Sequence, residues 1–173
     1  RPSTVRGYYQ PLTMVSLMLD RFFGGSQDAM RAFHRTSLLF HTANTALLGI
    51  LVYMLFGQPC VAAGISLVFG LHPITVEQIS WIAERKTVLA SFFALWSLIS
   101  YVQYTYDTRK RYYIATVVAY ILALLSKPIV VPLPVVMLLM HYWPLGHLRQ
   151  ENVKQMWPLF AIGASFLVIT YIS

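Results

Sequence analysis

Four long runs without a charged side chain constrain this chain more than any other feature. Residues 36–56, 87–106, 128–148 and 155–173 contain no Asp, Glu, Lys or Arg. About twenty apolar residues in a helix cross the roughly 30 Å hydrocarbon core of a bilayer. Only 11% of the 173 residues are charged, whereas soluble domains carry about 25%. The sequence therefore predicts an integral membrane protein.

The length of these runs predicts an all-α, polytopic transmembrane helical bundle with about six spans. We expect residues 1–173 to form a single transmembrane domain. The expected spans lie near residues 33–56, 59–72, 87–106, 112–126, 129–145 and 156–173. Pro73 should end or bend the second span, and Pro132 and Pro134 should make the start of the fifth irregular.

The first 32 residues precede these spans and are expected to be external or interfacial. Residues 11–23 predict an amphipathic helix that lies in the plane of the membrane interface. Gly24 and Gly25 should break this helix, and Asp20 should form an exposed ion pair with Arg21. The apolar side chains of the helix recur every three or four residues; they are Leu12, Val15, Met18, Leu19 and Phe22.

Ionisable side chains are concentrated in the junction at residues 71–86. They are His72, Glu77, Glu84, Arg85 and Lys86. Charged groups close to hydrocarbon are costly and usually mark a site or a pathway. The alternative is a solvated loop that faces lipid headgroups, with Trp81 as an interfacial anchor.

Other polar residues have simpler interpretations. His41 and Asn44 are three residues apart, so they share a helix face and should form interhelical hydrogen bonds. Cys60 is the single cysteine, and we expect a packed thiol. The net charge of +7 comes from basic residues at the ends of apolar runs. This placement suits anionic headgroups and excludes nucleic acid as a partner.

A series of short motifs runs in order along nearly the whole chain. They are Tyr8-Tyr-Gln-Pro-Leu-Thr13, Ser16-Leu-Met-Leu-Asp20, Phe23-Gly24, Phe33-His34, His41-Thr-Ala-Asn44, Leu71-His-Pro73 with Glu77, Trp81-Ile82, Glu84-Arg-Lys86, Ser126-Lys-Pro128, Leu133-Pro134 and Tyr142-Trp-Pro-Leu145. The ordered set resembles the membrane glycosyltransferases associated with tetratricopeptide repeats. That family is similar to the protein O-mannosyltransferases, which are glycosyltransferases of the GT-C type.

The resemblance implies a polyprenyl- or dolichyl-phosphate sugar as donor and a protein or lipid as acceptor. It implies an active face on the periplasmic side of a bacterial inner membrane or the lumenal side of the ER. The basic residues leave the orientation open, and the resemblance places residues 109–111 in the cytoplasm. Membrane lipids, the lipid-linked sugar, the acceptor and other membrane subunits are the expected partners.

The family's catalytic acid comes from an acidic pair in an external loop upstream of the motifs quoted above. We therefore expect the chain to be a fragment of a longer protein, active if that protein supplies the pair. Gln10 and Thr87 depart from the family pattern, which often has Arg or His at the first position and Asp at the second. The alternative function is a non-catalytic membrane scaffold or accessory subunit with the same fold.

Sugar transfer from a phosphate carrier needs positive charge on the leaving phosphate and a base for the acceptor hydroxyl. The candidate phosphate-binding residues are Arg85, Lys86, Lys127 and His72. Arg85 and Lys86 could instead be headgroup anchors, and Lys127 could extend to the interface as a snorkelling side chain.

Glu77 and Glu84 are the supporting catalytic candidates. They are seven residues apart and would share one face of a continuous helix. A metal site formed by His72 and these two acids has little support from spacing, so we assign no metal ligand. The requirement for a divalent metal is left open.

Overall fold

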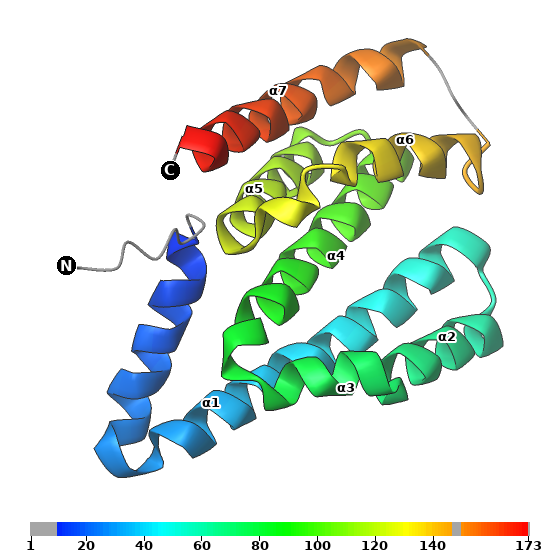
Figure 1. The fold of residues 1–173 in the computed structure, drawn as a ribbon. Helices are drawn as coiled ribbons and strands as arrows, with labels where there is room; N and C mark the ends of the chain where they lie inside the picture. The colour runs from blue at the N-terminus through cyan, green and yellow to red at the C-terminus, as the bar shows by residue number, and fades with distance from the viewer. Residues whose placement is uncertain (1–9, 147–149, 173) are drawn as a thin grey trace.

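The computed structural model describes the backbone of residues 10–146 and 150–172 (Figure 1). Within these ranges every regular element is a helix, which confirms the all-α prediction. The elements are α1 (Pro11–Phe56), α2 (Pro59–Leu71), α3 (Pro73–Ser80), the 3-10 turn η1 (Ile82–Glu84), α4 (Arg85–Tyr106), α5 (Lys110–Ser126), the 3-10 turn η2 (Pro128–Val130), α6 (Leu133–Tyr142) and α7 (Gln150–Ile172).

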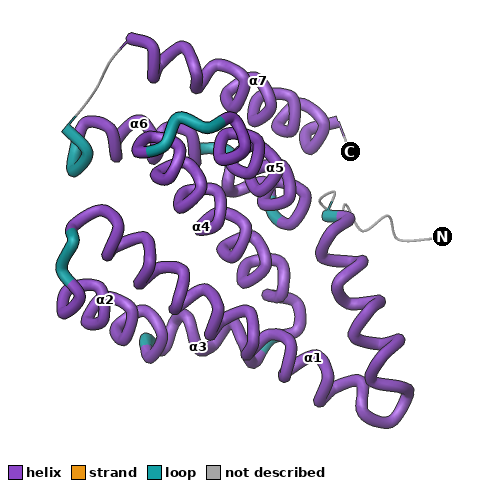
Figure 2. The backbone as a smooth tube through the Cα atoms, turned by 180° about the vertical axis from the view of Figure 1, so that it is seen from behind, coloured by secondary structure: helices purple, strands orange, loops and turns teal. Residues whose placement is uncertain are grey.

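Helix α1 is 46 residues long and changes direction sharply in its first part, which is drawn in blue in Figure 1 and is seen from behind in Figure 2. The Thr36 hydroxyl donates to Asp20 Oδ1 at 2.9 Å, although the two residues are 16 positions apart. In a straight helix they would be about 24 Å apart at 1.5 Å per residue. Gly24 and Gly25 lie between them, and paired glycines are a common cause of kinks. The glycines were predicted to end the helix. That prediction was wrong, because the helix bends and continues to Phe56.

The part of α1 before the bend, residues 11–23, is called the arm below. It begins at Pro11, which suits the first position of a helix because it lacks an amide hydrogen. Most of the apolar side chains predicted to form one face are exposed, and Phe22 is 81% exposed. Its placement in a membrane interface stays a prediction.

Helix α2 packs beside α1 after the turn at Gly57 (Figure 2). Gly57 adopts a left-handed conformation with φ 66°, and its amide donates to Tyr53 O at 2.8 Å. This conformation favours glycine and ends α1. The predicted bend at Pro73 is confirmed. His72 is extended, and the chain resumes as α3, because a residue before proline disfavours helical geometry.

Helix α4 is the centre of the bundle and packs against both α1 and α5. The Ser97 hydroxyl donates to Thr116 O at 2.9 Å and joins α4 to α5 inside the core. The core also draws on α6 and α7. Its most enclosed members are Val102, Tyr120, Leu124, Met137, Met156 and Leu159.

Among the residues that the structure describes, two helical segments are long and apolar enough to cross a membrane, Met30–Phe56 within α1 and Arg85–Tyr106. The expected total of about six spans is not confirmed. Prolines divide the fifth run into η2 and the ten-residue α6, and ten residues span about 15 Å. Helix α2 has 13 residues, and α7 begins at Gln150, earlier than the predicted residue 156.

The bundle has two ends of different composition. At one end, the Tyr106 hydroxyl donates to Met54 O at 3.4 Å, and the rings of Phe56 and Trp143 lie 5.4 Å apart. This brings the carboxyl ends of α1, α4 and α6 together. Trp143 is exposed, but His141 is buried and bonded to the Tyr101 hydroxyl.

Candidate functional site

The opposite end of the bundle holds two clusters of polar side chains. The first, called the arginine cluster, comprises the side chains of Asp20, Thr36 and Arg85 with the backbone carbonyl of Phe33. Arg85 is the first residue of α4, its side chain is 0% exposed, and it forms an ion pair with Asp20 on the arm. The same nitrogen, Nη2, also donates to Phe33 O at 3.0 Å. One guanidinium therefore contacts α1 on both sides of its bend.

The second cluster, called the lysine cluster, comprises Glu84, Thr87 and Lys127. Lys127 follows the last residue of α5, and its ammonium donates to the Thr87 hydroxyl at 2.6 Å. The Thr87 hydroxyl donates in turn to Glu84, whose carboxylate lies 3.7 Å from Lys127 Nζ. Glu84 and Lys127 are partly exposed, so this cluster is accessible where the arginine cluster is closed.

The lysine cluster keeps Glu84 ionised. The hydrogen bond from Thr87 lowers the pKa of Glu84 below its usual value, and the positive charges of Lys127 and Lys86 lower it further. Partial burial opposes this shift but does not reverse it. A carboxylate with a lowered pKa is a weak general base. Glu84 is therefore better suited to hold Lys127 in place than to accept a proton.

The structure brings some of the predicted site residues together and places others elsewhere. Arg85, Glu84 and Lys127 gather at this end of the bundle, and Lys86 is half-buried in the first turn of α4. Glu77 is exposed on α3, on a different helix from Glu84. The predicted shared face of one continuous helix was wrong, because the chain leaves helical geometry at Trp81.

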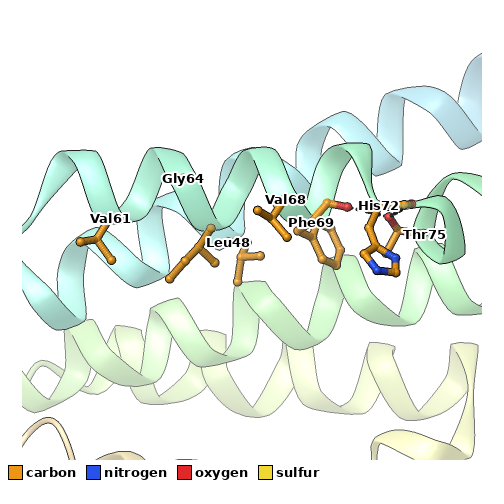
Figure 3. A pocket seen from close by; sticks show the side chains of 8 residues that line it. Leu48, Val61, Gly64, Val68, Phe69, His72 and Thr75 are labelled. Carbon is orange, nitrogen blue, oxygen red and sulfur yellow. Dashed lines mark hydrogen bonds between the residues drawn. The ribbon is translucent and has the colours of Figure 1, made fainter.

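His72 has a local structural role. Its Nδ1 accepts a hydrogen bond from the amide of Ile74 at 3.3 Å, which caps the start of α3. It also stands at one end of a groove of about 590 Å³ (Figure 3). The groove follows α2, and its other lining side chains are mostly apolar: Leu48, Val61, Ile65, Val68 and Phe69, with Thr75 beside His72. This lining suits an apolar chain better than a sugar.

Two further predictions concern His41 and Asn44, and both are confirmed. His41 Nε2 lies 3.1 Å from Gly70 O, and the Asn44 amide donates to Val88 O at 2.9 Å. They join α1 to α2 and to α4. Among the described residues, no group of three or more His, Cys, Asp or Glu side chains is placed to hold a metal ion.

The ion-pair partner of Asp20 in this candidate site was predicted wrongly from the sequence. Asp20 was predicted to form an exposed pair with Arg21, but it pairs with Arg85, 65 residues away. Thr36 and Thr87 were not identified as members of a site. Asp20 and Arg85 both lie in segments that carry the family resemblance, and this was the feature of the sequence that could have linked them. Spacing alone cannot identify a contact made by folding the arm back.

The fold and the two clusters define a helical protein with long apolar helices and charged groups gathered at one end. Comparison with curated proteins gives this description a family context. Over 96 residues, or 56% of the chain, it is 35% identical to "Protein O-mannosyl-transferase tmtc2" of Xenopus laevis. The proteins named "Protein O-mannosyl-transferase TMTC2" of Homo sapiens and Mus musculus are each 32% identical over the same length.

The chain is therefore similar to proteins named as O-mannosyl-transferases, and this similarity confirms the resemblance to O-mannosyltransferase-like proteins found in the motifs. The chain spans 11% of the length of each of these relatives. No protein-family profile matches the chain. No solved structure matches it.

Proposed function

We propose that the chain is part of a membrane glycosyltransferase that transfers a sugar from a polyprenyl- or dolichyl-phosphate donor to a protein or lipid acceptor. Transfer takes place on the periplasmic or lumenal face of a bacterial inner membrane or the ER membrane. The observation that carries the proposal is the placement of Arg85, Glu84 and Lys127 at the same end of an apolar bundle. The names of the relatives supply the reaction type.

The chemistry of the proposed reaction assigns a different task to each cation. Breaking the bond between sugar and phosphate leaves negative charge on the phosphate, which a positioned cation stabilises. Lys127 is partly exposed, so it is the first contact for the donor phosphate. Arg85 is the second contact, and its side chain is fully buried.

Glu84 supports this site by fixing Lys127, directly and through Thr87. Its lowered pKa makes it a poor acceptor of the proton from a sugar-accepting hydroxyl. We assign that proton to an acid outside these residues, in the upstream loop that the family resemblance implies. Glu77 is exposed on α3 and has no assigned step.

The membrane setting is proposed from two sources. Met30–Phe56 and Arg85–Tyr106 have the length and apolarity of membrane spans. A polyprenyl-phosphate donor is itself a lipid, so an enzyme that uses it works at a bilayer. The face on which the reaction takes place follows from the family resemblance alone.

The test uses the full-length protein that contains this chain, reconstituted in membranes with dolichyl- or undecaprenyl-phosphate sugars. Lys127→Met should raise the KM for the donor roughly tenfold or more, because a hydrogen bond to a charged group is worth about 1.5–3 kcal/mol. The matched control is Lys110→Met, which removes an exposed lysine at the other end of α5.

If Lys127→Met and Lys110→Met have the same KM for the donor, Lys127 does not bind the donor phosphate. A full-length protein that transfers no sugar from any polyprenyl-phosphate donor would contradict the enzymatic proposal itself. The chain would then be explained by the alternative function, a non-catalytic membrane scaffold or accessory subunit.

A further inference from the structure

The arginine cluster contains unused hydrogen-bonding capacity. Arg85 is 0% exposed, and both of its described contacts, to Asp20 and to Phe33 O, are made by Nη2. The other two nitrogens, Nε and Nη1, are buried without a partner among the described residues. Buried guanidinium nitrogens usually have partners, because leaving them unpaired is costly. The missing partners therefore point to an acceptor that joins this cluster.

Asp20 fixes the orientation of this guanidinium. One of its oxygens takes the ion pair with Arg85, and the other accepts the hydrogen bond from Thr36 at 2.9 Å. The carboxylate is thus held from both sides and holds Nη2 in place. The two unpaired nitrogens are left available for a second anion.

The arm also reaches the lysine cluster at its other end. The Thr13 hydroxyl donates to Ser126 O at 3.2 Å, next to Lys127. Thr13 and Asp20 are seven residues apart, or about 10 Å along a helix. The two anchors of the arm therefore contact the chain neighbours of Lys127 and Glu84, whose charged atoms lie 3.7 Å apart. Figure 1 shows the dark-blue arm running alongside the start of α4.

We propose that Asp20 is a positioning residue for lipid-phosphate binding. Acting through Arg85, it sets the guanidinium so that Nε and Nη1 receive a phosphate oxygen beside Lys127, and it holds the arm against the start of α4. The ligand chemistry is the phosphate group of a lipid. This inference rests on the proposed function for the identity of the lipid as a sugar carrier, but it can be tested by binding alone.

The experiment measures two quantities on the full-length protein. The first is amide hydrogen exchange in residues 11–23. The second is binding to phosphatidylcholine vesicles that contain dolichyl phosphate, phosphatidic acid or neither. Asp20→Asn should speed exchange in the arm and weaken binding to dolichyl phosphate about tenfold, because the guanidinium loses its fixed partner. Asp20→Glu keeps the charge and should recover most of the binding.

The matched control is Asp107→Asn, which breaks an exposed ion pair with Arg109 at 3.1 Å. It should change neither quantity. The double variant with Asp20→Arg and Arg85→Asp separates positioning from simple support. It restores opposite charges and should slow exchange in the arm again, while binding stays weak because the guanidinium now lies on the arm.

Several results would overturn the proposal. Unchanged exchange in Asp20→Asn would mean that the pair does not hold the arm. Recovery of dolichyl-phosphate binding in the double variant would reduce the pair to a structural support. If amide exchange in the arm stays fast in the double variant, the binding of the two single variants tests the positioning role of Asp20. Binding lost in Asp20→Asn and recovered in Asp20→Glu supports positioning, and any other pattern contradicts it.

The vesicle series identifies the source of the phosphate. A preference for dolichyl phosphate over phosphatidic acid supports a carrier-lipid site. Equal binding to both supports a site for lipid phosphate in general, and loss of binding to both in Asp20→Asn still supports the positioning role. A full-length protein that transfers no sugar would contradict the proposed function and leave these binding and exchange results intact.

Discussion

A guanidinium without solvent contact needs an anion beside it, and for Arg85 that anion is Asp20. Removing one partner of a buried ion pair leaves an uncompensated charge, at a cost of about 3–5 kcal/mol. Replacing both partners with apolar side chains avoids that cost. Stability alone therefore does not explain the ion pair between Asp20 and Arg85, and a functional role explains it better.

We expect Arg85→Met to lower the free energy of unfolding by about 3–5 kcal/mol, because Asp20 stays largely buried without its cation. The double variant Arg85→Met with Asp20→Leu should recover most of this loss and still lack lipid-phosphate binding. Thermal denaturation of the full-length protein in detergent measures the first effect. A double variant no more stable than Arg85→Met would contradict this account of the pair.

Glu84 makes a pH-dependent contribution to stability. Its pKa in the folded protein lies below 4.5, so its ionised form stabilises the fold above that pH. The contribution is lost as the pH falls below 4.5 through the folded pKa. The Tm of the wild type should therefore exceed that of Glu84→Gln at neutral pH, and the difference should shrink in acid. A difference that stays constant with pH would refute the assignment.

At the scale of single helices, one buried side chain sets the packing of α1 on α4. Asn44 is 2% exposed, and its amide donates to Val88 O at 2.9 Å. Asn44→Ala should lower the free energy of unfolding by about 1 kcal/mol, the usual size of an interhelical hydrogen bond in a membrane protein. Thr42→Val is the control, because the exposed Thr42 hydroxyl bonds only within its own helix, to Leu38 O. If Asn44→Ala and Thr42→Val lose the same free energy of unfolding, the hydrogen bond of Asn44 does not hold α1 on α4.

Helix ends were predicted well where proline or glycine determines local geometry. Pro11 begins α1, Gly57 ends it, and Pro73 marks the bend between α2 and α3. The prediction was less successful at Gly24 and Gly25, where propensity indicates a weak point but cannot distinguish a break from a bend. The contact between Asp20 and Thr36 decides that question, and it exists only in the folded chain.

At the scale of the whole molecule, the two ends of the bundle should face opposite sides of the membrane. The ends of α1 and α4 meet through Tyr106 and Met54, whereas the arginine and lysine clusters lie at the other end. In a protein in which the exposed Cys60 is replaced by serine, cysteines introduced at Gln58 and Thr108 should therefore react with an impermeant maleimide from the same side. A cysteine at Glu77 should react from the opposite side. All three positions are exposed.

Labelling of all three cysteines from one side of sealed vesicles would contradict a crossing by both Met30–Phe56 and Arg85–Tyr106. Labelling of Gln58 and Thr108 from opposite sides would mean that only one of α2 and α4, which lie between these two positions, crosses the membrane. The side on which Glu77 is labelled also tests the proposed periplasmic or lumenal placement of the site.

The sequence by itself determined the helical class, the apolar character and the ordered motifs, because helix periodicity and apolar length act over neighbouring residues. It also gave Arg85, Glu84 and Lys127 as candidate site residues, since charges are rare in such a chain. Only the tertiary structure decided their partners. Asp20 reaches Arg85 and Lys127 reaches Glu84 because α1 bends back on itself and α5 returns beside α4. Contacts of this kind depend on how the helices pack, and packing is a property of the whole chain.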